Sequence, residues 1–267
     1  MYNKINESQI EQFAIELLQS LGWDYVFGPD TAPDSENNLS KIANRKSFED
    51  VVLLDILENK LKIINPQIPE NAINDAIKIV CTVPTQYPNM IANNEAFHRL
   101  LTEGIKVTYR KDGEEKGDIV KLIDFDNPEN NDFLAINQFT VVENNINKRP
   151  DVVLFVNGIP LIVIELKNPA DESATIKSAY NQIQTYKQQA IPSLFSYNEI
   201  IVFSDGFEAK EGSLSAGIDR FMAWKSIYDI GRDAMHCVST LPQLELLIKG
   251  LLNKETFLDF LRFFIGW

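Results

Sequence analysis

Residues 1–104 carry a hydrophobic pattern whose period of three to four residues is typical of helices. Apolar side chains recur at this spacing after Ser8, which is a candidate N-cap, and Gly22 ends the run. The same spacing predicts three more helices, over residues 47–61, 69–80 and 93–101. A stretch rich in Pro, Asp and Asn, residues 28–40, predicts a surface loop. We therefore expect a helical N-terminal lobe.

From residue 105 the hydrophobic period changes to two, which indicates strands with one buried face. Turn pairs such as Asp112-Gly113 and Asn157-Gly158 separate the apolar runs. The predicted strands are residues 105–111, 119–125, 133–142, 152–156, 161–166 and 199–204. Helical spacing returns in residues 174–189, 241–252 and 255–265. This order predicts an α/β protein with a core over residues 105–240 and C-terminal helices over residues 241–267.

The composition changes this picture little, but the charge limits the possible functions. Of the 267 residues, 45% are hydrophobic and 24% are charged, which excludes a wholly disordered or low-complexity chain. Lys and Arg number 25 against 38 Asp and Glu, so the formal net charge is −13. This balance argues against a protein that binds nucleic acid through net charge alone. It leaves room for a DNA enzyme whose site holds divalent cations.

Neither the cysteines nor the apolar runs point to secretion or to a membrane. Cys81 and Cys237 are too few for a disulfide framework, so each is expected to be a small buried residue in a reducing compartment. The polar start of the chain lacks the apolar stretch of a signal peptide. The longest apolar run, residues 159–164, is far shorter than a membrane span. We predict a soluble cytoplasmic protein with no membrane partner.

The most informative chemistry lies between residues 150 and 167. Pro150-Asp151 is followed by thirteen residues and then by Glu165-Leu166-Lys167. Glu165 and Lys167 are two apart, so in a strand their side chains project from the same face. Because an acid and a lysine beside so many apolar residues cost stability unless they are paired, one explanation is a solvated ion pair at the rim of the sheet. The other is a functional site shared with Asp151.

The hairpin that joins the two predicted strands decides whether Asp151 meets Glu165. A strict two-residue turn at Asn157-Gly158 would place Asp151 opposite Ile164, with Glu165 on the other face. A three-residue or bulged loop would place Asp151 directly across from Glu165. Pro160 cannot donate to the ladder and Gly158 suits a positive φ, so we expect the loop of odd length.

Two carboxylates beside a lysine suit metal-dependent hydrolysis of phosphodiesters. Carboxylates are the oxygen ligands that Mg²⁺ prefers, and Mg²⁺ keeps several waters in its coordination shell. The metal lowers the pKa of a bound water and offsets the charge that develops in the transition state. Lys167 would position that water or stabilise the pentavalent phosphorane. From spacing alone, the rim ion pair remains an open alternative.

The same residues resemble the PD-(D/E)xK nuclease motif. Several segments are also similar, in the same order, to the restriction (motor) subunit of type I restriction–modification enzymes; they are residues 137–140 (NQFT), 149–153 (RPDVV), 157–161 (NGIPL), 164–169 (IELKNP) and 204–206 (SDG). The resemblance is close from about residue 94 onward and looser before it. It implies a restriction-endonuclease-like mixed central sheet flanked by helices, and cleavage of double-stranded DNA with Mg²⁺. It also implies that Asp151 and Glu165 are catalytic metal ligands and that Lys167 is the catalytic lysine.

The resemblance extends to two further elements. Gln182 and Tyr186 match the Gln-x-x-x-Tyr motif of the family and lie one turn apart on a predicted helix, so they share a face. That face would look toward the active site or the DNA. Members of the family also often carry an acid on the first helix, for which Glu11 is the candidate. Glu7 and Glu16 on the same helix are expected to be solvated.

The resemblance also implies partners and a motor. Type I enzymes combine the restriction subunit with methyltransferase and specificity subunits, and couple cleavage to ATP-driven translocation. None of the 12 glycines is followed by Lys, so no Walker A loop is present, and ATP concerns only a full-length subunit. We therefore predict the N-terminal nuclease portion of such a subunit. The alternatives are a stand-alone nuclease and a non-cleaving docking or regulatory module.

The remaining polar clusters are weaker candidates. Asp118, Asp124 and Asp126 lie at predicted strand ends, where acids commonly form turns. His98 and His236 are the only histidines and are too few for a zinc cage. We expect His98 to pack on its helix.

Overall fold

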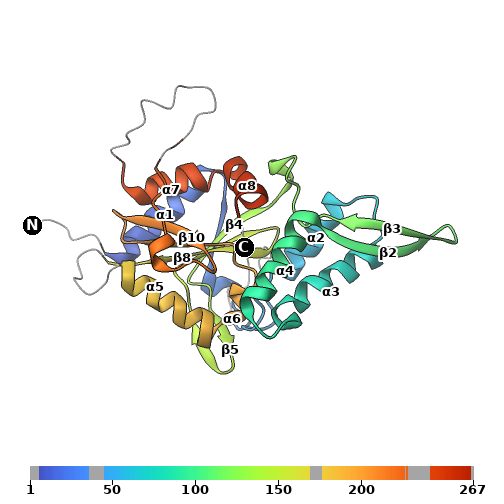
Figure 1. Ribbon diagram of the computed structural model, residues 1–267, viewed down its shortest axis with the longest axis horizontal. Helices are drawn as coiled ribbons and strands as arrows, with labels where there is room; N and C mark the ends of the chain where they lie inside the picture. The colour runs from blue at the N-terminus through green and yellow to red at the C-terminus, as the bar shows by residue number, and fades with distance from the viewer. Residues whose placement is uncertain (1–5, 36–44, 169–175, 226, 228–240, 266–267) are drawn as a thin grey trace, which may run out of the picture.

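The computed structural model describes residues 6–35, 45–168, 176–225, 227 and 241–265, and places them around one mixed sheet (Figure 1). The sheet has six strands in the order β1-β4-β7-β8-β9-β10. The β1–β4 and β8–β9 pairs are parallel, and the other neighbours are antiparallel. The strands are β1 (Asp24–Phe27), β4 (Phe133–Asn137), β7 (Val152–Val156), β8 (Ile159–Leu166), β9 (Ile200–Ser204) and β10 (Ala209–Ser213). The predicted α/β class with a mixed central sheet flanked by helices is confirmed.

The middle of the sheet is buried on both faces. Every residue of β4, β7, β8 and β9 is buried, which matches the continuous apolar runs of these strands. Helices α1 (Glu7–Ser20) and α7 (Gln243–Leu251) pack together on one side of the sheet, and α5 (Ile176–Thr185) lies on the other (Figure 1). A five-residue π-helical turn, Tyr186–Ala190, and the short α6 (Pro192–Phe195) follow α5.

Three further helices form a separate group at one end of the molecule. They are α2 (Leu54–Ile64), α3 (Glu70–Gln86) and α4 (Met90–Glu103). Figure 1 shows them beside the hairpin of β2 (Ile105–Lys111) and β3 (Glu114–Val120). In contrast, α1 packs on the central sheet, and β1 is one of its strands. The N-terminal 104 residues therefore supply both the helical lobe and part of the layer that carries the site.

Several predicted boundaries are wrong for local reasons. Asn6 caps α1 in place of Ser8, because its side chain accepts a hydrogen bond from Gln9 N at 2.9 Å. The helix predicted over residues 47–61 starts only at Leu54. The Asp50 carboxylate accepts hydrogen bonds from Lys46 N and Ser47 N, which forms a turn there.

Two strand predictions also need correction. The strand predicted over residues 119–125 is β3, Glu114–Val120, whose register with β2 follows from the tight turn at Asp112-Gly113. The strand predicted over residues 133–142 is interrupted at Gln138, which has a φ of 54°. Its second part, β5 (Val141–Glu143), pairs with β6 (Ile146–Lys148).

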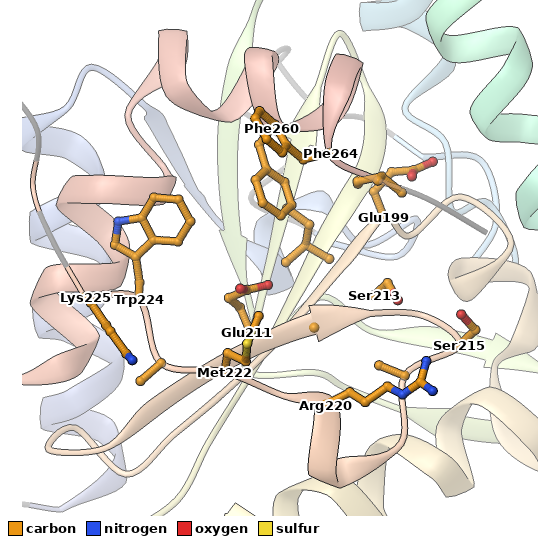
Figure 2. A pocket seen from close by; sticks show the side chains of 15 residues that line it. Glu199, Glu211, Ser213, Ser215, Arg220, Met222, Trp224, Lys225, Phe260 and Phe264 are labelled. Atoms are coloured by element: carbon orange, nitrogen blue, oxygen red, sulfur yellow. The ribbon is translucent and has the colours of Figure 1, made fainter. Parts of the chain in front are cut away.

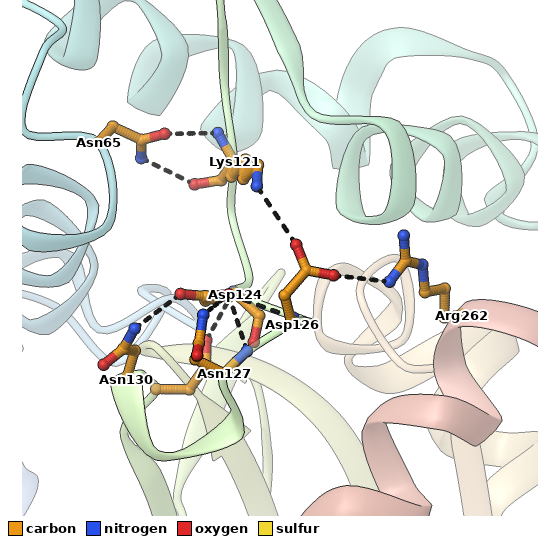
Figure 3. Close-up of polar contacts among 8 residues, drawn as sticks. Asn65, Lys121, Asp124, Asp126, Asn127, Asn130 and Arg262 are labelled. Atoms are coloured by element: carbon orange, nitrogen blue, oxygen red, sulfur yellow. Dashed lines mark hydrogen bonds and ion pairs between the residues drawn. The ribbon is translucent and has the colours of Figure 1, made fainter.

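Helix α8 (Lys254–Phe263) contacts an acidic loop of the core through an ion pair (Figure 3). Arg262 Nη1 contacts Asp126 Oδ1 at 3.2 Å, and Asp126 also faces Lys121 Nζ at 3.7 Å. The Asp124 carboxylate accepts hydrogen bonds from the backbone N of Asn127 and from Asn130 Nδ2. Asp124 is thus a turn former, as predicted, and Asp126 is an ion-pair partner.

Two predictions about burial and membranes can be checked as well. Among the described residues, no helix is long and apolar enough to cross a membrane. Cys81 is exposed on α3, so the prediction that it is buried is wrong, because it lies on the solvent side of an amphipathic helix. Cys237 and His236 lie outside the described residues.

Candidate active site

The β7–β8 hairpin has the register that brings Asp151 and Glu165 together. Its turn has two residues, Asn157 and Gly158, with φ values of 52° and 81°. The extra residue lies in β8 itself, because a bulge after Pro160 shifts the pairing so that Val152 faces Ile164. One step further along the ladder, Asp151 stands across from Glu165. The register is the predicted one, but the odd residue is in the strand and not in the loop.

Both carboxylates are buried at the end of this hairpin. Asp151 is 8% exposed and Glu165 is 1% exposed. Asp151 Oδ2 accepts a hydrogen bond from Leu166 N at 2.6 Å. Glu165 Oε1 lies 2.8 Å from Lys167 Nζ, whereas Glu165 Oε2 is buried without a partner. A solvated ion pair at the rim of the sheet therefore does not describe these residues.

Burial governs the electrostatics of the pair. Desolvation raises the pKa of Asp151 and of Glu165 above the usual carboxyl range, because a charge is costly away from water. The Asp151 charge raises the pKa of Glu165 further, and the Lys167 ammonium opposes both shifts. Two acids that repel each other in a low-dielectric site are typical of functional sites, where a bound cation relieves the repulsion.

Lys167 connects the acids to α5. Lys167 Nζ donates to Gln182 Oε1 at 2.9 Å, and Gln182 Nε2 donates to the Tyr186 hydroxyl at 2.7 Å. Tyr186 begins the π-helical turn and is 5% exposed, and burial raises its pKa to about 12. Such turns occur frequently at functional sites. The structure thus joins Glu165, Lys167, Gln182 and Tyr186 in one chain of contacts.

The acids of α1 lie beside this site in different ways. Glu11 Oε1 accepts a hydrogen bond from Asn137 Nδ2 at 2.7 Å, and Glu11 Oε2 accepts another from Gln138 Nε2. Its charge contributes to the raised pKa of Asp151. Glu7 is exposed, as expected, yet its charge also raises the pKa values of both Asp151 and Glu165. Glu16 is exposed and bonded to Gln12.

Sequence reasoning missed the roles of Glu7, Asn137 and Gln138. Asn137 and Gln138 belong to a segment that carries the family resemblance, but a pair of amides at the end of an apolar run is also common in ordinary turns and gave them no role. His98 lies elsewhere: its Nδ1 is 2.9 Å from Oε2 of Glu199, the residue before β9, so it packs on its helix, as expected.

The acid pair fits a divalent cation that is completed by other ligands. The unpartnered Glu165 Oε2 is a buried acceptor that lacks a positive partner. Within the described ranges, no group of three or more His, Cys, Asp or Glu side chains is close enough to hold a metal. Mg²⁺ suits such a site, because it is commonly held by one or two carboxylates together with waters and phosphate oxygens.

A hollow lies away from this site, between the sheet and α8 (Figure 2). Its volume is about 910 Å³. Figure 2 shows the Glu211 side chain pointing into it, toward the aromatic rings of α8. Burial raises the pKa of Glu211 to about 7. None of Asp151, Glu165 and Lys167 lines this hollow.

The mixed sheet flanked by helices is consistent with a nuclease-like fold, and the comparisons with known proteins place the chain more narrowly. The model of the type I restriction enzyme R protein N terminus matches residues 4–220. The chain therefore belongs to the family of type I restriction enzyme R proteins and corresponds to their N-terminal domain.

Relatives agree with this assignment. The endonuclease subunit of the type I restriction enzyme HindI of Haemophilus influenzae is 38% identical over 98% of this chain and 24% of its own length. A Methanocaldococcus jannaschii protein assigned to the same class of subunit is 34% identical over 98% of this chain and 26% of its own. The EcoprrI endonuclease subunit of Escherichia coli is 31% identical over 52% of this chain and 46% of its own. The chain spans about a quarter of the length of the first two relatives.

Proposed function

We propose that this chain is a metal-dependent endonuclease domain of the PD-(D/E)xK type, which hydrolyses phosphodiester bonds of double-stranded DNA. One observation carries the proposal: the bulged hairpin buries Asp151 and Glu165 side by side, with Lys167 on one of them and Glu165 Oε2 left without a partner. In the full-length subunit, ATP-driven motor domains would deliver the DNA. Methyltransferase and specificity subunits would be its partners, and the cytoplasm its compartment.

Each residue of the site has a role in this proposal. Asp151 and Glu165 would hold Mg²⁺, which when bound supplies a more acidic water and charge for the phosphate oxygens. Lys167 Nζ would orient the attacking water and stabilise the phosphorane. Gln182 holds that ammonium in place, and the Tyr186 hydroxyl in turn orients the Gln182 amide. Glu11 would add negative charge beside Asp151.

Two basic residues mark the side from which DNA would enter. Lys148 Nζ lies 5.8 Å from the centre of the Tyr186 ring, and the Arg149 charge lowers the pKa of Tyr186 against the larger effect of burial. Both residues directly precede Pro150-Asp151. Lys187 does not belong to this group, because it is buried with its Nζ on Leu214 O. We propose that Lys148 and Arg149 contact a DNA phosphate next to the site.

The first prediction concerns metal binding. Excess Mn²⁺ or Mg²⁺ should raise the Tm of the wild-type chain, by roughly 5 °C when the cation is present at about 100 times its Kd. Asp151→Asn keeps the shape and an acceptor for Leu166 N but removes the charge, so it should abolish the rise. Differential scanning calorimetry with and without EDTA measures both. Asp124→Asn is the matched control and should respond like wild type; an equal rise in Asp151→Asn would place the cation elsewhere.

A second prediction concerns DNA affinity. Because the net charge is −13, the isolated chain should bind duplex DNA weakly at physiological salt, with a Kd above about 1 μM. Fluorescence anisotropy with Ca²⁺ in place of Mg²⁺ tests this without cleavage. Submicromolar affinity would contradict delivery of the DNA by other domains and would favour a stand-alone nuclease.

A non-cleaving docking module is the other alternative. Such a module gains nothing from two buried carboxylates, which cost stability by desolvation. The hollow beside α8 would be its natural feature, but no residue of the acid–lysine site lines it. Cleavage by the intact site, and its loss in Lys167→Ala, decides between the two functions.

A further inference from the structure

The carboxylate of Glu11 is held at both of its oxygens by consecutive amides. Asn137 Nδ2 donates to Oε1 at 2.7 Å, and Gln138 Nε2 donates to Oε2. The Asn137 amide is itself oriented by Tyr25, whose hydroxyl donates to Asn137 Oδ1 at 3.0 Å. Asn137 therefore links β1 at the end of β4 to Glu11 of α1.

Gln138 reaches Glu11 only because its backbone leaves the strand. In an extended strand, neighbouring side chains point to opposite faces, so Asn137 and Gln138 could not both contact one carboxylate. The φ of Gln138 is 54°, in the left-handed region that non-glycine residues rarely adopt. This conformation turns the Gln138 side chain back toward the face of Asn137. Left-handed backbone in a non-glycine residue is unfavourable and persists only where the surroundings enforce it.

The surroundings that enforce it connect Gln138 to the candidate metal site. Gln138 N donates to Asp151 O at 2.9 Å. Gln138 therefore holds both the backbone of Asp151 and the side chain of Glu11. On the opposite side, Gly28 packs so closely that an added Cβ would lie 2.1 Å from Asn137 O and 2.6 Å from Gln138 O. The peptide between Asn137 and Gln138 is thus clamped between Gly28 and Asp151.

Gln138 links Glu11 to the site, because its side chain donates to Glu11 Oε2 and its backbone N donates to Asp151 O. The Glu11 charge contributes to the raised pKa of Asp151, yet no cluster of three acids within the described residues is tight enough to bind a cation directly. A carboxylate in this position attracts a cation and can hydrogen-bond to its waters, provided that the carboxylate is kept in place.

We propose that Gln138 is a positioning residue, whose left-handed backbone holds the Glu11 carboxylate beside Asp151 and so sets the affinity of the site for a divalent cation. The inference rests on the proposed function, because it requires Asp151 and Glu165 to bind a cation. It adds a residue outside the acid–lysine motif, and it explains why a strained backbone lies at the end of β4.

The test uses glycine, which separates the side chain from the backbone strain. Gln138→Gly removes the amide that holds Glu11 but adopts a positive φ without penalty. We expect an unchanged or higher Tm without metal, together with Mn²⁺ binding about tenfold weaker by isothermal titration calorimetry, the size typical of groups that orient metal ligands. Asn145→Gly relieves a φ of 65° in the β5–β6 turn, which within the described residues makes no hydrogen bond or ion pair with Glu11 or Asp151, and is the matched control. It should raise or keep the Tm and leave Mn²⁺ affinity unchanged.

A double variant assigns the effect to Glu11. In a Glu11→Gln background, Gln138→Gly should weaken Mn²⁺ binding no further, because the carboxylate that Gln138 holds is gone. The inference is overturned if Gln138→Gly binds Mn²⁺ like wild type, or if it loses affinity equally in both backgrounds. If the wild-type chain binds no Mn²⁺, or if Asp151→Asn binds it like wild type, the proposed function fails first and the inference with it.

Discussion

Replacing Lys167 with alanine is expected to reduce DNA cleavage by a restriction complex that contains this domain about a hundred- to a thousandfold. Lys167 Nζ contacts the buried acid pair, 2.8 Å from Glu165 Oε1. Its side chain is only 13% exposed, so its charge acts in a poorly screened environment. Translocation and ATP hydrolysis should persist in the same assay, because this chain contains no Walker A loop.

Two measurements decide whether that loss is chemical or structural. The Tm of Lys167→Ala should fall only modestly, because the buried Glu165 can take up a proton once its partner is gone. Lys177→Ala, which replaces an exposed lysine of α5, is the matched control and should cleave normally. An unfolded Lys167→Ala domain would assign Lys167 a structural ion pair, and normal cleavage by Lys167→Ala would remove it from the mechanism.

Gly158→Ala should lower the free energy of unfolding by roughly 2–4 kcal/mol, because it adds a steric clash to an unfavourable backbone conformation. Gly158 has a φ of 81°, and an added Cβ would lie 2.5 Å from Leu53 O. The turn cannot move away easily, since Leu53 N donates to Gly158 O at 2.8 Å and Asn157 Nδ2 donates to Leu122 O at 2.8 Å. Urea denaturation measures the change.

Gly113→Ala is the control that isolates the clash. Gly113 has a φ of 85°, but nothing lies within 4 Å of an added Cβ. It should therefore lose only the conformational part, about 1–2 kcal/mol. Equal losses in the two variants would show that the contact with Leu53 does not restrain the hairpin turn. Because this hairpin carries Asp151 and Glu165, a larger loss for Gly158→Ala should be accompanied by a weaker thermal response to Mn²⁺.

Local patterns predicted the elements that have strong local signals. The strands over residues 105–111 and 152–156 have the predicted bounds, because apolar positions and turn pairs delimit them. β1 and β10 were not predicted, for different reasons. β1 has only four residues, and β10 contains charged residues and Gly212. Both are strands because a neighbour in the sheet supplies their hydrogen bonds, which a local window cannot show.

For the candidate site too, some features follow from the sequence and others only from the tertiary structure. The sequence alone determined the residue types and spacing of Asp151, Glu165, Lys167, Gln182 and Tyr186, because the alternation of a strand and the turn of a helix place them on shared faces. It also determined that Asp151 and Glu165 need one extra residue in the hairpin to meet. Only the tertiary structure decided that this residue is a bulge in β8, because a bulge depends on how both strands pair with their neighbours.

Tertiary structure also decided the surroundings of the acids. Glu165 is buried by segments that are distant in the sequence. The Glu7 charge raises the pKa of Glu165, and Gln138 donates a hydrogen bond to Glu11; each of these pairs is more than one hundred residues apart. Hydrophobic periodicity indicates which face of a helix or strand a side chain lies on, but not which distant segment packs against that face. The sequence therefore determined which groups are the candidates for the chemistry, and long-range packing determined their burial, their electrostatic surroundings and their orientation.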